Sequence, residues 1–169
     1  MKNTKLITML CLGALIACSP SKKGLEPTSE QVSPRERLIE NLRATPQKGI
    51  MFGHHDDTVY GIGWEFDEGG SDVQKVCGDY PAVISFDLGE IELGGDKSLD
   101  KVPFEKIRKE IINQYNRGGL VSLSWHPRNP KTGGDAWDVS DHAVVKSILP
   151  EGENYEKFQS WLGKVNDFI

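Results

Sequence analysis

The chain has 169 residues, a formal net charge of −5, 37% apolar residues and 27% charged residues. This acidic balance argues against a nucleic-acid-binding protein, whose surface must attract phosphates with lysine and arginine. The composition is typical of a folded globular protein, and the length allows one domain of modest size. Of the three cysteines, two lie in the first 18 residues, so Cys77 has no disulfide partner in the rest of the chain.

The N-terminus has the pattern of an exported protein that is processed at a cysteine. Lys2 and Lys5 form a short basic region, and residues 6–17 form an apolar run too short to span a bilayer as a permanent helix. The run ends in Leu15-Ile16-Ala17-Cys18, which resembles the lipobox of bacterial lipoproteins.

We therefore expect a signal peptide over residues 1–17, lipidation of Cys18 and a polar tether over residues 18–32. The lipid would be the protein's only membrane attachment, because no later apolar stretch is long enough to cross a bilayer. The expected location is the outer membrane of the cell envelope. No acidic run directly follows Cys18, which favours the periplasmic side over the cell surface.

From residue 33 the chain alternates between helix and strand patterns. Ser33-Pro34-Arg35-Glu36 is a capping box with proline at the first helical position, so a short helix should follow. Residues Gly49–Gly53 predict a buried strand. Ser71-Asp72-Val73-Gln74 is a second capping box, and it predicts a short helix that Gly78 ends. Residues Ala82–Phe86 predict the next buried strand.

The second half of the chain continues the alternation. Apolar residues at helical spacing predict a helix that begins at Pro103 and ends at Gly118-Gly119. A third strand is expected over Leu120–Trp125, and an amphipathic helix over Tyr155–Ile169. Strands that alternate with helices predict βαβ units around a buried parallel sheet, as in the open doubly wound fold and the (β/α)₈ barrel.

Ionisable residues follow all three predicted strands. A dinucleotide-binding sheet should show G-x-G-x-x-G after its first strand, whereas the chain has Gly53-His54-His55-Asp56-Asp57. In a barrel the chemistry lies at the carboxyl ends of the strands, where Asp87 and His126 also fall. Three such ends indicate a functional site. Neighbouring strand residues point apart, so at most one of His54 and His55 should face it.

Four segments resemble glycoside hydrolase family 26. They are Phe52-Gly53-His54-His55-Asp56, Ser85-Phe86-Asp87-Leu88-Gly89, Ser122-Leu123-Ser124-Trp125-His126-Pro127-Arg128-Asn129-Pro130 and Gly133-Gly134-Asp135-Ala136-Trp137-Asp138. The segment around the third strand is the most specific of them. The resemblance extends roughly from Gly49 to Ile169.

This resemblance implies a (β/α)₈ barrel that acts, without a cofactor, as a retaining endo-β-1,4-mannanase on β-mannan or manno-oligosaccharides. Members carry an acid/base glutamate in a His-Glu motif after strand four and a nucleophilic glutamate after strand seven. The chain stops at Ile169, in the helix that would precede strand four. We therefore expect residues 33–169 to be the N-terminal part of such a domain, with three βα units and neither catalytic glutamate.

The resemblance also implies substrate-binding roles. His126 resembles the family's histidine in the −1 subsite, where a neutral imidazole can hydrogen-bond a sugar hydroxyl. Trp137 lies in a glycine-rich loop and could present its flat face to the C–H face of a pyranose. Asp87 and Glu90 are expected to bind hydroxyls or to orient other side chains. Trp125 points away from His126 along the strand and is expected to pack.

Further candidates come from the first strand end and the loop after it. His54 and His55 are both retained as sugar-binding candidates, although only one is expected to face the cleft. Trp64 and Glu65, in a loop with several glycines, are weaker candidates for reaching it.

Two other functions remain open. His54-His55-Asp56-Asp57 offers the ligand types of a metal-dependent hydrolase such as a polysaccharide deacetylase. Four consecutive residues do not fit around one tetrahedral ion, and therefore we assign no metal site. The second alternative is a lipoprotein that binds glycans through the same surface without cleaving them.

Overall fold

The structure is a computed structural model that describes residues 32–169. The predicted signal peptide and the lipidated Cys18 lie outside the described residues, as does all of the tether except Val32. Among the described residues, no helix combines the length and the apolar character needed to cross a membrane. The described residues fall into two units, residues 32–43 and residues 44–169.

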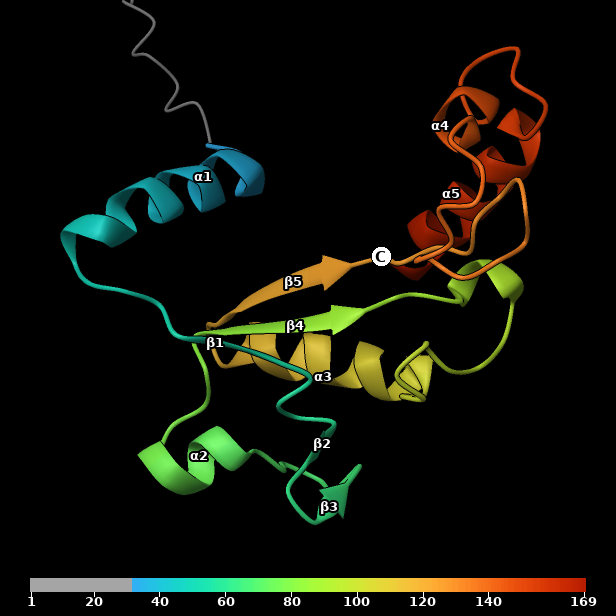
Figure 1. The fold of residues 1–169 in the computed structure, drawn as a ribbon. Coiled ribbons are helices and arrows are strands. Elements are labelled where there is room, and N and C mark those ends of the chain that lie inside the picture. The colour runs from blue at the N-terminus through green and yellow to red at the C-terminus, as the bar shows by residue number, and fades with distance from the viewer. Residues whose placement is uncertain (1–31) are drawn as a thin grey trace, which may run out of the picture. The chain divides into compact units, whose positions relative to one another are not determined.

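In the first unit the structure describes one helix, α1 (Pro34–Ala44), which runs one residue past the unit boundary (Figure 1). The predicted capping box is formed. The Ser33 N–H donates to the Glu36 carboxylate at 2.9 Å, and the Glu36 N–H donates to the Ser33 hydroxyl at 3.2 Å. These two bonds satisfy donors that a helix start leaves without partners.

The second unit is built on a parallel three-stranded sheet. Its strands are β1 (Gly53–His55), β4 (Val83–Asp87) and β5 (Leu120–Ser124), in the order β1-β4-β5. In the register, His55 lies beside Ser85, and Asp87 lies beside Ser124. All three strands therefore end at the same edge of the sheet, as the βαβ pattern predicts.

Helices connect and cover these strands. Between β1 and β4 lies α2 (Asp72–Cys77), where the Ser71 hydroxyl caps the Gln74 N–H at 2.9 Å and Gly78 ends the helix with a positive φ of 82°. Between β4 and β5 lies α3 (Phe104–Asn116), which runs along one face of the sheet (Figure 1). Both helices confirm the predicted ones. Capping chemistry fixes both ends of α2, whereas α3 begins after Pro103 without a side-chain cap and ends before Gly118, which has a positive φ of 80°.

The core lies between the sheet, α3 and the end of the chain. Its fully buried apolar side chains come mainly from β4, the turn after it and α3: Val59, Ile84, Phe86, Leu88, Val102 and Ile107. The final helix α5 (Tyr155–Phe168) packs against the 3₁₀ turn η2 (Ile91–Leu93), and Phe168 meets Phe104 edge-to-face at 5.8 Å. The predicted C-terminal helix is thus confirmed.

The prediction of a buried strand over Gly49–Gly53 was wrong. The strand begins where the prediction ended, all three of its residues are exposed, and Ile50 before it is 99% exposed. β1 is an edge strand that pairs only with β4 in the described part of the chain, so its apolar flank has no neighbour to bury it. The third strand also ends one residue early, at Ser124, which places His126 two residues beyond it.

Several short elements were not predicted. They are the 3₁₀ turn η1 (Thr45–Gln47), the paired strands β2 (Tyr60–Gly61) and β3 (Trp64–Glu65), η2, and the helix α4 (Val144–Ser147). Elements of two to four residues are too short to show a periodicity, and therefore the sequence pattern gave no sign of them.

Candidate active-site cleft

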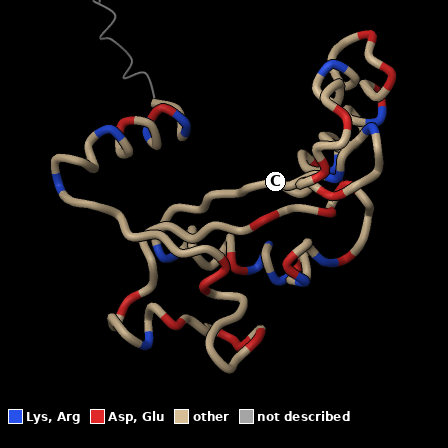
Figure 2. Tube along the Cα trace, viewed as in Figure 1, with Lys and Arg blue, Asp and Glu red and all other residues tan. Residues whose placement is uncertain are grey.

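The strand ends form one wall of an open cleft of about 340 Å³. Its lining side chains come from the ends of all three strands and from two loops: His55, Asp87, Leu99, Asp100, Ser124, His126 and Trp137. Figure 2 shows acidic residues where β4 ends and in the turn that follows it. Parallel strands therefore bring together side chains up to about 80 positions apart in the chain, as the sequence predicted for the strand-end edge.

Asp87 is the centre of the hydrogen-bond network in this cleft. The Ser124 hydroxyl and His126 Nδ1 both donate to Asp87 Oδ2 at 2.5 Å, and the Gly89 N–H donates to Oδ1 at 2.6 Å. Burial raises the pKa of Asp87, but the bonds from Ser124, Gly89 and His126 outweigh burial and lower that pKa below its usual value. Asp87 is thus held as a carboxylate.

His126 is held by Asp87 yet remains accessible. Its side chain is 53% exposed, whereas that of Asp87 is 3% exposed. Because Nδ1 is directed at a carboxylate, the proton of a neutral ring resides on Nδ1, and Nε2 is the atom left to accept a hydrogen bond in the cleft. The Asp87–His126 pair therefore presents an oriented acceptor to whatever occupies the cleft.

Trp137 forms the outer wall beside His126. It is 81% exposed, and its ring lies 6.4 Å from the His126 ring at an interplanar angle of 24°. Its loop is braced from within, because the Asn129 side chain donates to the Asp138 carbonyl at 3.0 Å and the Thr132 hydroxyl donates to the Asp138 carboxylate. Because internal hydrogen bonds hold the loop, the exposed indole presents a flat apolar surface in a fixed position.

The two histidines at the end of β1 take different positions. His55 lines the cleft, and its Nδ1 lies 2.7 Å from the Ser85 hydroxyl, whereas His54 is not among the lining residues and its Nδ1 lies 2.7 Å from the His55 carbonyl. This placement agrees with the prediction that at most one of them faces the cleft. Asp57 is also directed elsewhere, because its carboxylate accepts from the Ser71 hydroxyl. The four consecutive residues considered as metal ligands therefore do not converge.

Glu90 and Trp125 lie outside the cleft lining. Glu90 pairs with the Arg128 guanidinium at 2.6 Å. Trp125 stacks on Phe158 at 5.8 Å and donates its indole N–H to buried Glu92 at 3.0 Å. Trp125 therefore packs, as expected. Glu90 holds the Arg128 side chain and does not itself face the cleft.

Sequence reasoning missed Leu99, Asp100 and Ser124 as lining residues. Leu99 and Asp100 belong to the loop before α3 and lie in no motif, while Ser124 lies in the third-strand motif but was not assigned a binding role. The alternation of side chains along β5 was the one available signal, since it places Ser124 and His126 on the same side. Trp64, by contrast, donates its indole N–H to Asp72 at 2.7 Å, and neither it nor Glu65 lines the cleft.

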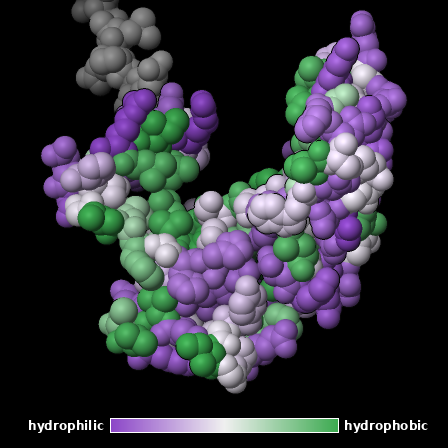
Figure 3. Space-filling view, viewed as in Figure 1, coloured by the Kyte–Doolittle hydropathy of each residue, from purple (hydrophilic) through white to green (hydrophobic). Residues whose placement is uncertain are grey.

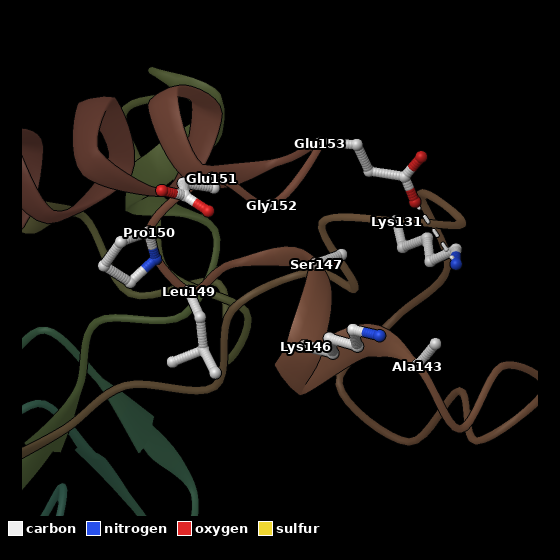
Figure 4. Close-up of a pocket in the computed structure, with 9 residues that line it drawn as sticks. All are labelled: Lys131, Ala143, Lys146, Ser147, Leu149, Pro150, Glu151, Gly152 and Glu153. Carbon is white, nitrogen blue, oxygen red and sulfur yellow. Dashed lines mark ion pairs between the residues drawn. The ribbon is translucent and has the colours of Figure 1, made fainter.

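A second cavity, of about 610 Å³, lies between α4 and the start of α5 (Figure 4). Two of its charged lining residues pair with each other, because Lys131 lies 3.2 Å from Glu153, and Lys131 also meets Asp141 at 3.1 Å. The surface around α4 and α5 is largely hydrophilic with isolated hydrophobic side chains (Figure 3). The smaller cleft, with its ordered histidine and exposed indole, is the better candidate for chemistry.

Comparison with known proteins agrees with this arrangement. The family profile of glycosyl hydrolase family 26 matches residues 27–169. The chain belongs to glycosyl hydrolase family 26. The resemblance inferred from the strand-end motifs is therefore confirmed, and the fold is that of the family's (β/α)₈ barrel, of which three βα units are present.

Among solved structures, a family 26 β-mannanase from Bacteroides ovatus is 62% identical, with a TM-score of 0.76, over 78% of this chain and 38% of its own. An endo-β-1,4-mannanase from Cellulomonas fimi is 28% identical, with a TM-score of 0.60, over 72% of this chain and 28% of its own. A mannan endo-1,4-β-mannosidase from Bifidobacterium adolescentis is 30% identical over 76% of this chain and 13% of its own. The chain thus spans well under half the length of these relatives.

Proposed function

We propose that this chain supplies part of the substrate cleft of a retaining endo-β-1,4-mannosidase that cleaves β-mannan. The observation that carries the proposal is the Asp87–His126 pair beside exposed Trp137, at the carboxyl edge of a family 26 sheet. The mannanase activities of the relatives from Bacteroides ovatus and Bifidobacterium adolescentis support the substrate class.

Each part of the cleft has a role in binding a sugar. His126 Nε2 accepts a hydrogen bond from a ring hydroxyl, and the bond strengthens as the ring distorts toward the oxocarbenium-like transition state. Trp137 packs against the apolar C–H face of a pyranose. Asp87 positions the imidazole and holds its proton on Nδ1.

The carboxyl pair that cleaves the bond comes, in this proposal, from strands four and seven of a longer chain. Retaining hydrolysis requires two carboxyl groups roughly 5–5.5 Å apart across the sugar. Asp87 and Asp100 are the carboxylates that line the cleft within the described residues, and Asp87 is already committed to three hydrogen bonds. We therefore assign neither Asp87 nor Asp100 the role of nucleophile or of acid/base.

The 169-residue chain by itself is accordingly expected not to hydrolyse mannan. The measurement is the release of reducing ends from mannan by purified chain, compared with a heated control. A chimera provides a second test of the proposal. In it, residues 44–169 replace the matching segment of the Bacteroides ovatus enzyme, and mannanase activity is expected to be retained. Hydrolysis by the chain alone, or an inactive but folded chimera, would contradict the proposal.

We also propose that the protein is anchored in the outer membrane, facing the periplasm, by lipid on Cys18. The support is the apolar run of residues 6–17 that ends directly before this cysteine. Replacing Cys18 with alanine is expected to abolish labelling by a clickable fatty acid in growing cells. Cys77→Ala is the matched control and should leave the labelling unchanged. Persistent labelling of Cys18→Ala would rule out the anchor.

A further inference from the structure

Three side chains that could ligate a metal, two of which line the cleft, lie close together. His55 Nε2 lies 3.3 Å from Asp56 Oδ2 and 4.0 Å from Asp100 Oδ2. One potential ligand atom from each residue lies within 4.8 Å of the other two. His55 and Asp100 also line the cleft, so the point can be reached from solvent.

The backbone explains how neighbouring residues reach the same point. Side chains of adjacent strand residues normally point to opposite faces. Asp56 follows the last residue of β1 and has a positive φ of 55°, which turns its side chain back toward that of His55. Asp100 comes from the loop before α3, where the Leu99 N–H donates to the Gly89 carbonyl at 3.0 Å. The backbone at Asp56 and the hydrogen bond from the loop of Asp100 therefore hold both carboxylates near His55.

The Asp56 carboxylate is buried without enough partners. It is 1% exposed, and its Oδ1 atom has no hydrogen-bond partner among the described residues. Oδ2 accepts from the Tyr60 hydroxyl at 3.1 Å. A buried carboxylate in this position is stabilised by a nearby cation.

His55 is oriented as a metal ligand would be. Its Nδ1 lies 2.7 Å from the Ser85 hydroxyl, and metal-binding histidines use their second nitrogen in this way to fix the ring. When Nδ1 donates this bond, the lone pair of Nε2 faces two carboxylate oxygens. In that tautomer the imidazole lone pair and the two carboxylate oxygens are directed at one point and can share a cation.

We propose that His55, Asp56 and Asp100 bind a divalent cation of the Mn²⁺ or Zn²⁺ class. One imidazole nitrogen and two carboxylate oxygens suit these ions, whereas Ca²⁺ takes six to eight oxygen ligands. The cation would neutralise Asp56 and would tie the end of β1 to the Asp100 loop. This proposal is independent of the mannan-binding role, because it concerns the affinity for a metal ion and requires no substrate.

The test measures Mn²⁺ binding to the metal-free 169-residue chain by electron paramagnetic resonance and calorimetry. One saturable site is expected. Loss of an outer partner of a metal ligand typically costs roughly 10- to 100-fold in affinity, so His55→Ala and Asp100→Asn should each weaken binding at least about tenfold. Both side chains are partly exposed, and therefore both variants should keep the circular dichroism spectrum of the parent.

Matched controls separate this site from adventitious binding by exposed groups. His142→Ala removes an exposed imidazole and Asp79→Asn an exposed carboxylate, both from outside the cluster. Neither change should alter the affinity for Mn²⁺. Binding that does not saturate at millimolar Mn²⁺ would overturn the proposal. An unchanged affinity in folded Asp100→Asn would do the same.

Discussion

Replacement of His126 by alanine in the chimera is expected to lower kcat/KM on mannan about a hundredfold and to leave the melting temperature unchanged. The lost interaction is one preorganised hydrogen bond to the sugar in its transition state, and losses of this kind cost about 3 kcal/mol in barrier. The fold should tolerate the change because the ring is half exposed and Asp87 keeps its bonds from Ser124 and Gly89. Steady-state kinetics and thermal unfolding measure the two effects.

His54→Ala is the matched control for this prediction. His54 is also a strand-end histidine and is exposed, but it does not line the cleft, so its removal should leave kcat/KM close to that of the parent. A His126→Ala chimera as active as the parent would remove His126 from the site. A chimera that fails to fold would show that the histidine is structural.

Asp87→Asn is expected to lower kcat/KM by about 10- to 100-fold in the same chimera, by analogy with changes to groups that orient a ligand. The amide has nearly the same shape, but its NH₂ group can donate to His126 Nδ1. The ring proton then moves to Nε2, which can no longer accept a hydrogen bond from the sugar. The kinetic comparison with Asp79→Asn, an exposed carboxylate outside the cleft, isolates this effect.

Two further measurements separate a positioning role of Asp87 from a purely structural one. In a His126→Ala background, Asp87→Asn should cost little additional activity, because the ring that Asp87 orients is already gone. If the losses of activity from the two substitutions simply add in the double variant, the positioning role of Asp87 is contradicted.

The second measurement is the pH dependence of the free energy of unfolding. The pKa of Asp87 is lowered in the folded protein, so its charge stabilises the fold above its unfolded pKa of about 3.9. That stabilisation is lost as pH falls through the folded pKa. The difference in stability between the parent and Asp87→Asn should therefore be largest near neutral pH and shrink in acid. A difference that stays constant into acid would mean that the Asp87 charge does not contribute.

Local chemistry made several elements predictable from the sequence. The starts of α1 and α2 follow from hydroxyl caps at Ser33 and Ser71, and the end of α2 follows from a glycine with positive φ. The second strand was placed within one residue, because Val83, Ile84 and Phe86 of β4 are apolar and the strand lies between two others. β1 was misplaced, since an edge strand has a solvent-exposed flank and its apolar residues do not mark its limits.

By itself, the sequence determined the βαβ order, the family and the three strand ends at which ionisable residues lie, because these depend on residue type and spacing along the chain. Only the tertiary structure decided which of these residues meet. His126 and Asp87 are 39 positions apart, and no local pattern encodes their 2.5 Å bond. Asp100 lies near His55 because the loop before α3 folds back across the strand ends. Asp57 lies away from them, because its carboxylate accepts a hydrogen bond from Ser71. Such contacts depend on loop closure and on one backbone turn at Asp56, which sequence spacing does not specify.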